Sequence, residues 1–138
     1  MFKYLIYIAF LLSFFSSCSS KKNLGGKSES KLSQKKENQF ASNFIEATTQ
    51  KIIGNYELAE KLFLEGLKIN PKSAATYFEL SGIYDYKKEG QESIESAQKS
   101  VELNADNDWY KTNLAVLYQK YGLYDKSLEL YKELTEKH

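Results

Sequence analysis

The side chains that carry most nucleophilic and metal-binding chemistry in proteins are nearly absent from this chain. Its 138 residues contain a single cysteine, Cys18, and a single histidine, His138. A clustered Cys/His metal site or a Ser-His or Cys-His nucleophile pair cannot be built inside a domain from this inventory. We therefore expect no enzymatic activity, no catalytic residue, no metal site and no cofactor. The chemistry that remains is that of the Cys18 thiol.

The residues before Cys18 indicate how this thiol is used. Lys3 is followed by an apolar run over residues 4–15, and two serines come directly before the cysteine. As a helix this run spans about 18 Å, whereas the hydrocarbon core of a bilayer measures about 30 Å. The segment is typical of a signal peptide, and it resembles that of bacterial lipoproteins, with Phe15 where leucine is commoner. The resemblance implies a signal peptide over 1–17 and acyl chains such as palmitate on Cys18; the alternative is an incidental thiol.

The residues after the cysteine predict a tether and a location. By the same resemblance, Ser19 in place of an acid implies the outer membrane, and Lys21 and Lys22 favour its periplasmic face. The segment up to residue 38 is rich in serine, lysine and glycine and contains only two leucines. Such a composition buries too little apolar surface to fold. We expect residues 18–38 to form a lipidated, flexible, basic tether in the bacterial cell envelope, bound to the membrane through Cys18.

Charge is distributed unevenly along the chain. Residues 19–38 carry six lysines and two glutamates, whereas residues 39–138 carry twelve lysines and sixteen acids. All the basic residues are lysine, so the chain lacks arginine, the forked donor that reads guanine edges and clamps phosphates. We therefore expect no nucleic-acid binding.

A repeat of 34 residues runs through residues 39–138. Small side chains recur at this spacing in two sets: Ala47, Ser81 and Ala115, and Ala59, Ser93 and Ser127. Two helices approach closely only where small side chains meet, so each member of the first set is expected to lie against its counterpart in the second. Gly54 and Gly122 lie two periods apart and are expected to end helices, because glycine accepts positive φ. Lys88 occupies the equivalent place in the middle unit.

This spacing resembles the tetratricopeptide repeat (TPR). The first unit carries Gly54, Tyr56, Ala59, Phe63 and Pro71, and the third carries Gly122, Tyr124, Ser127 and Tyr131. The resemblance implies an all-α, TPR-type α-solenoid of three helix-turn-helix repeats over about 40–73, 74–107 and 108–138, preceded by the signal peptide and the disordered tether. We expect helices at about 38–52, 56–69, 74–88, 91–103, 108–121 and 124–137.

Local signals support these boundaries. Pro71 cannot continue a helix and biases Asn70 away from helical geometry. Ser73 and Asn107 offer side-chain oxygens to the free amides of the helices that follow them.

The resemblance also implies a concave groove that binds a peptide or a partner's helix. The matching positions are Phe44, Thr48 and Lys51 in the first repeat, Phe78, Asp85 and Tyr86 in the second, and Trp109, Thr112, Gln119 and Lys120 in the third. Aromatic residues are enriched at binding hot spots, although Phe44 and Phe78 suit a core role equally well. Lys51 and Lys120 are candidates to hold a carboxylate.

Two functions follow from this sequence. The first is a membrane-anchored scaffold or adaptor that binds other proteins in the cell envelope. The second is the N-terminal anchor and repeat region of a larger envelope protein, a secretion or assembly factor or a hydrolase, whose active part lies beyond residue 138. Solenoids need a terminal helix with a polar outer face, whereas the last predicted helix carries Leu128, Leu130, Tyr131 and Leu134, part of which should be left open. It is therefore expected to be continued by further repeats, or covered by a partner or by self-association.

Overall fold

The computed structural model describes residues 24–136. The predicted signal peptide, Cys18 and His138 lie outside the described residues. The chain divides into two units, Met1–Lys31 and Leu32–His138. The described part of the first unit is the beginning of one helix, so the account below concerns the second.

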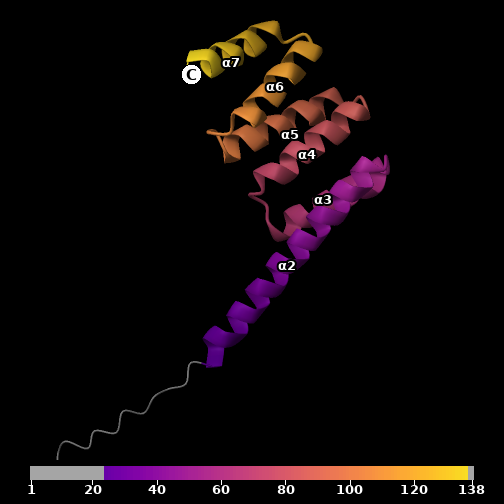
Figure 1. The fold of residues 1–138 in the computed structure, drawn as a ribbon, viewed down its shortest axis with the longest axis vertical. Helices are drawn as coiled ribbons and strands as arrows, with labels where there is room; N and C mark the ends of the chain where they lie inside the picture. The colour runs from indigo at the N-terminus through magenta and orange to yellow at the C-terminus, as the bar shows by residue number, and fades with distance from the viewer. Residues whose placement is uncertain (1–23, 137–138) are drawn as a thin grey trace, which may run out of the picture. The chain divides into compact units, whose positions relative to one another are not determined.

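Six helices and no strand occur among residues 24–136 (Figure 1). They are α2 (Leu24–Ile52), α3 (Tyr56–Ile69), α4 (Ala74–Tyr86), α5 (Gly90–Leu103), α6 (Asp108–Lys120) and α7 (Tyr124–Glu136). Helix α4 pairs with α5 and α6 pairs with α7, and α2 contacts α3 through Ala47, Ala59 and Phe63. This confirms the predicted all-α class and its three helix-turn-helix units. None of the helices in this part of the chain combines the length and the apolar character of a membrane span.

The first helix begins much earlier than the sequence analysis predicted. Residues 24–37 were expected in a flexible tether, but α2 already starts at Leu24. From Lys27 onward this stretch lacks glycine and proline and is rich in lysine, glutamate and glutamine, which have good helix propensity. Gln34 also donates a 3.0 Å hydrogen bond to Asn38 one turn later. Since residues 29–39 are exposed, local propensity rather than burial accounts for this helix, and the compositional argument missed it.

The helix starts that were predicted from capping residues are confirmed. The Ser73 hydroxyl accepts a hydrogen bond from the backbone N–H of Thr76 at 3.2 Å. The Asn107 side chain accepts from the N–H of Trp109 at 3.0 Å. Each cap satisfies an amide that has no partner within its own helix. The chain therefore enters α4 and α6, the first helices of the second and third units, through side-chain caps.

The turns inside the three units share one backbone geometry. The φ angles are +85° at Gly54, +64° at Lys88 and +79° at Gly122. In each turn the amide after this residue bonds a carbonyl five residues back, as in Glu89 N–H to Tyr84 O at 2.9 Å. This is the Schellman ending of a helix, which favours glycine. In the second unit a lysine adopts the conformation that glycine supplies in the other two.

Small residues lie at the helix crossings, as the 34-residue period predicted. All six members of the two sets are buried, with at most 3% of any one exposed. In the second unit the Ser93 hydroxyl donates to the Ser81 carbonyl at 2.9 Å, and in the third Ser127 donates to Ala115 at 2.8 Å. Close backbone approach therefore comes with a hydrogen bond that satisfies the buried hydroxyl.

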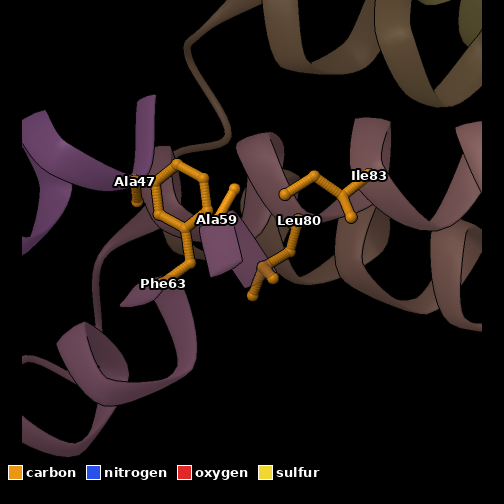
Figure 2. Close-up of a cluster of buried hydrophobic side chains, with 5 residues drawn as sticks. All are labelled: Ala47, Ala59, Phe63, Leu80 and Ile83. Atoms are coloured by element: carbon orange, nitrogen blue, oxygen red, sulfur yellow. The ribbon is translucent and has the colours of Figure 1, made fainter. Parts of the chain in front are cut away.

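Two apolar clusters fill the space around these crossings. The first joins α2, α3 and α4 and consists of Ala47, Ala59, Phe63, Leu80 and Ile83 (Figure 2). The second joins α5 and α6 and consists of Ile94, Ala97, Leu114, Leu117 and Tyr118. Each cluster spans two repeats, so neighbouring units stabilise one another as the stacking of a solenoid requires.

Candidate interaction groove

The first helices of the three units contact one another directly along one side of the solenoid. Lys51 of α2 pairs with Glu79 of α4, with 2.6 Å between the ammonium nitrogen and the carboxylate oxygen. Between α4 and α6, the Asn113 amide donates to the Ser81 hydroxyl at 3.0 Å. These contacts join residues about 30 positions apart and hold the three helices in fixed register.

An apolar hollow lies between α4 and α6. It is lined by Phe78, Trp109, Thr112, Asn113 and Val116, and its volume is about 190 Å³. The Trp109 side chain is 69% exposed and that of Val116 is 48% exposed. On its inner side the Phe78 ring packs on the ring of Tyr110, with 5.3 Å between the centroids. Covering an exposed indole and the half-buried ring beside it would remove apolar surface from water, which is favourable.

A second hollow lies at the other end of the same two helices, and we call it the polar hollow because charged residues and tyrosines line it. It is lined by Gly82, Asp85, Tyr86, Lys88, Lys120 and Tyr121, with a volume of about 580 Å³. We refer to the two hollows together as the α4–α6 groove.

Asp85 is the centre of the polar hollow. One of its oxygens accepts from the Lys120 ammonium at 2.6 Å and from the Tyr121 hydroxyl at 3.0 Å. The bond to Asp85 raises the pKa of Lys120. Burial, followed by the bond to Asp85, raises the pKa of Tyr121. Both donors are protonated at neutral pH, as lysine and tyrosine ordinarily are, and the raised pKa values reflect their contacts with this carboxylate.

The residues predicted from the sequence to line a groove fall into two groups. The structure brings six of them together around the two hollows: Phe78, Asp85, Tyr86, Trp109, Thr112 and Lys120. The other four are not among the lining residues: Phe44, Thr48, Lys51 and Gln119, although the Lys51 ammonium lies beside Gly82 at the wall of the polar hollow. Phe44 packs edge-on against Phe63, with 5.5 Å between the ring centroids, and is partly buried against the first core cluster. Gln119 is exposed near the end of α6.

Two hydroxyls at predicted groove positions bind their own helix. Thr48 donates to the Phe44 carbonyl at 2.8 Å, and Thr112 donates to the Asp108 carbonyl at 2.8 Å. Their donors are therefore satisfied before any ligand arrives, which leaves their methyl groups as the more useful contact surface.

Sequence reasoning missed five residues that line the hollows. They are Asn113 and Val116 in the apolar hollow, and Gly82, Lys88 and Tyr121 in the polar one. Val116 had a recognisable signal, because it lies one helical turn after Thr112 and so shares its face. Gly82 had none, since its role depends on the neighbouring α2.

Comparison with known proteins agrees with this geometry. The family model described as tetratricopeptide repeat matches residues 74–107, which is the second predicted unit. A crystal structure of MamA is 20% identical with a TM-score of 0.67, covering 71% of this chain and 57% of that one. The structure of MamA from residue 41 to its end, from Desulfovibrio magneticus RS-1, is 22% identical with a TM-score of 0.67, covering 72% and 56%. The chain thus spans somewhat more than half the length of these MamA chains.

A second kind of neighbour is similar over nearly its whole length. The second TPR of Spaghetti (RPAP3), solved with the HSP90 peptide SRMEEVD, is 14% identical with a TM-score of 0.68, covering 74% of this chain and 94% of that one. At such identities the likeness shows the fold alone. Residues 74–107 therefore match the tetratricopeptide repeat, and the helical unit that contains them has the fold of a tetratricopeptide-repeat solenoid.

Proposed function

We propose that this chain is a membrane-anchored scaffold of the bacterial cell envelope, whose α4–α6 groove binds a segment of another protein. The observation that carries the proposal is the apolar hollow with the exposed Trp109 at its edge. Tryptophan is among the residues most enriched at binding hot spots. The likeness in fold to the RPAP3 repeat domain, which was solved with a peptide, supports the same role.

The fold favours binding over catalysis. TPR solenoids present extended surfaces made by stacked helix pairs, which suit the capture of protein segments. The polar side chains of the groove are joined to one another: Asp85 binds Lys120 and Tyr121, and Asn113 binds Ser81. We propose that the groove acts through contact and not through a reactive group.

A pull-down with two matched variants tests this role. Trp109→Ala removes the exposed indole of the apolar hollow, and Tyr124→Ala removes a 68% exposed aromatic on α7 that lines neither hollow. The full chain and Tyr124→Ala are expected to recover the same envelope proteins, and Trp109→Ala is expected to lose them. Equal recovery by all three proteins would show that the groove is not the binding surface.

The anchor is the second part of the proposal. We propose that Cys18 is acylated at the end of the signal peptide and holds the solenoid at the outer membrane, facing the periplasm; its support is the resemblance of residues 1–18 to lipoprotein signals. Intact-mass measurement of the membrane-extracted protein should show a chain that begins at Cys18 and carries acyl chains. Cys18→Ser should release the protein from the membrane fraction. Retention of Cys18→Ser there would contradict lipid anchoring.

The exposed fractions of two equivalent residues, one on α5 and one on α7, favour a second interaction surface. Ile94 of α5 packs against α6 and is 8% exposed, whereas Leu128, the same position one period later on α7, is 54% exposed. We propose that this face of α7 is covered by a second copy of the chain. Sedimentation should then show a dimer that Leu128→Lys dissociates and the groove variant Val116→Lys does not. A monomer at all concentrations would rule this out.

A further inference from the structure

We infer that the groove selects a partner segment through an uncharged, apolar anchor residue, and that it discriminates against acidic segments. The inference rests on the proposed function, because it names the chemistry of the segment that the groove binds. It concerns the lysines at Lys51 and Lys120, which the sequence alone offered as carboxylate ligands. In the structure each of them is neutralised by a carboxylate of α4.

Lys51 is held against α4. Its ammonium lies 2.6 Å from Glu79, and the side chains of this pair are only 29% and 20% exposed. Built onto Gly82, a Cβ atom would lie 3.3 Å from the same ammonium. The absence of a side chain at Gly82 therefore lets Lys51 rest on the α4 backbone. A ligand carboxylate at this ammonium would have to share it with Glu79, whose like charge lies 2.6 Å from the same nitrogen and would repel the ligand.

The Lys120 ammonium is likewise paired with a carboxylate of α4. Its partner Asp85 is 27% exposed and holds the Tyr121 hydroxyl as well. A carboxylate that reached Lys120 would stand within a few ångströms of Asp85 in the polar hollow, where like charges repel. Lys88 adds one positive charge to this hollow from an exposed turn. Across residues 39–138, however, sixteen acids outnumber twelve lysines. The lining of this hollow therefore keeps one net positive charge, from Lys88, and the wider surface adds none.

The apolar hollow provides the alternative source of affinity. Its volume of about 190 Å³ is below the range of about 300–1,000 Å³ that is usual for small-molecule pockets. It suits a single inserted side chain better than a whole small ligand. Phe78, Trp109 and Val116 surround that space with apolar surface, so an aliphatic or aromatic side chain would bind there by desolvation.

Selection from a random peptide library tests the inference. The full chain in detergent is the bait, with Trp109→Ala and Tyr124→Ala as the matched pair. We expect the enriched peptides to share a large apolar residue and to lack acidic residues, and we expect Trp109→Ala to weaken their binding about tenfold or more. Salt between about 50 and 300 mM screens ion pairs. Affinity should change little over this range, because the expected contact is apolar and involves no ion pair.

The outcomes separate the inference from the proposed function. Enriched peptides that are acidic, or that bind through a free carboxylate, would overturn the inference while the groove remains a binding site. No enrichment, or enrichment that is unchanged by Trp109→Ala, would overturn the proposed function and the inference with it.

A charge variant tests the cause directly. In Glu79→Gln/Asp85→Asn both lysines lose their acidic partners while the side chains keep their size. With the acidic peptide SRMEEVD as the probe, we expect this variant to bind about tenfold or more tightly than the wild type. Equal affinity for the two proteins would mean that neutralised lysines are not what excludes acids. Circular dichroism of the variant checks that its helices are retained, and the library selection does not depend on it.

Discussion

Lys88 is a residue whose side chain conflicts with its backbone. Its φ of +64° repeats, at intervals of 34 residues, the +85° of Gly54 and the +79° of Gly122. An L-residue with a side chain pays about 1 kcal/mol or more for this left-handed conformation. We expect Lys88→Gly to raise the free energy of unfolding by about 0.5–1 kcal/mol. The gain is less than the full conformational cost, because glycine also loses more backbone freedom on folding. Chemical denaturation measures the difference.

Gly122 provides the reciprocal control for Lys88. A Cβ atom at Gly122 would have nothing within 4 Å, so replacement there affects the backbone conformation and no neighbouring side chain. Gly122→Ala should lower the free energy of unfolding by a similar amount. A neutral result for both variants would mean that φ at these turns carries no energetic cost.

Gly90 is required for a different reason, because the Tyr121 ring lies close to its backbone. A Cβ atom there would lie 2.4 Å from Cε1 of Tyr121, and this ring belongs to the side chain that donates to Asp85. Gly90→Ala should displace the ring and lower the free energy of unfolding by about 1–3 kcal/mol, as overpacking usually does. Thermal unfolding of Gly90→Ala, Tyr121→Ala and the double variant tests the pair. The cost of Gly90→Ala should vanish when Tyr121 is already alanine.

At the scale of helices, the crossing between α4 and α5 is the contact most sensitive to size. Ser93 is fully buried, and its hydroxyl bonds the Ser81 carbonyl of the opposing helix. Ser93→Phe should force the two helices apart and lower the free energy of unfolding by about 1–3 kcal/mol or more. The control is Glu92→Phe, which adds the same ring to an exposed neighbour on α5. Equal melting temperatures for the two variants would contradict the crossing assigned to Ser93.

The crossings and caps were predictable because they depend on residues within a single unit. The local sequence is enough to recognise a small residue that recurs every 34 positions, or an Asn or Ser that precedes a helix. Phe44 and Phe78 show the limit of prediction from a single unit. They occupy the same repeat position, yet Phe44 packs on Phe63 within its own unit and Phe78 packs on Tyr110 of the next. Which neighbour lies beside an aromatic ring depends on the stacking of units, and the period does not reveal that.

The ion pairs of the groove were beyond sequence reasoning for the same reason. Lys51 meets Glu79 at a separation of 28 residues, and Lys120 meets Asp85 at 35. Neither separation equals the repeat length, so both pairs arise from the offset between stacked helices. The extent of α2, in contrast, was predictable, because the helix propensity of its residues forms a helix even where little apolar surface is buried.

Across the described residues, two acids, Glu60 and Asp85, each contact protonated groups of the following helix pair. Burial, and then Glu60, raises the pKa of Tyr84; Glu60 and Glu89 raise the pKa of Lys87, whose ammonium is 2.9 Å from Glu60. Asp85 acts in this way on Lys120 and contributes to the raised pKa of Tyr121. All four shifts have one sign: the folded state retains protons that the unfolded chain releases near pH 10–10.5, as model peptides do (about 10 for tyrosine and 10.4 for lysine).

This sign determines how stability depends on pH. Where the folded pKa is raised, the stabilisation is fully present below the unfolded pKa and is lost as the pH rises through the folded one. We expect the melting temperature to stay level from neutral pH to about pH 9 and to fall above about pH 10. The variant Tyr84→Phe/Tyr121→Phe removes the two tyrosine contributions and should show a shallower fall when both proteins are scanned by circular dichroism. Identical slopes would mean that the lysines and the backbone, rather than the contacts of Glu60 and Asp85 with these hydroxyls, set the alkaline limit of the solenoid.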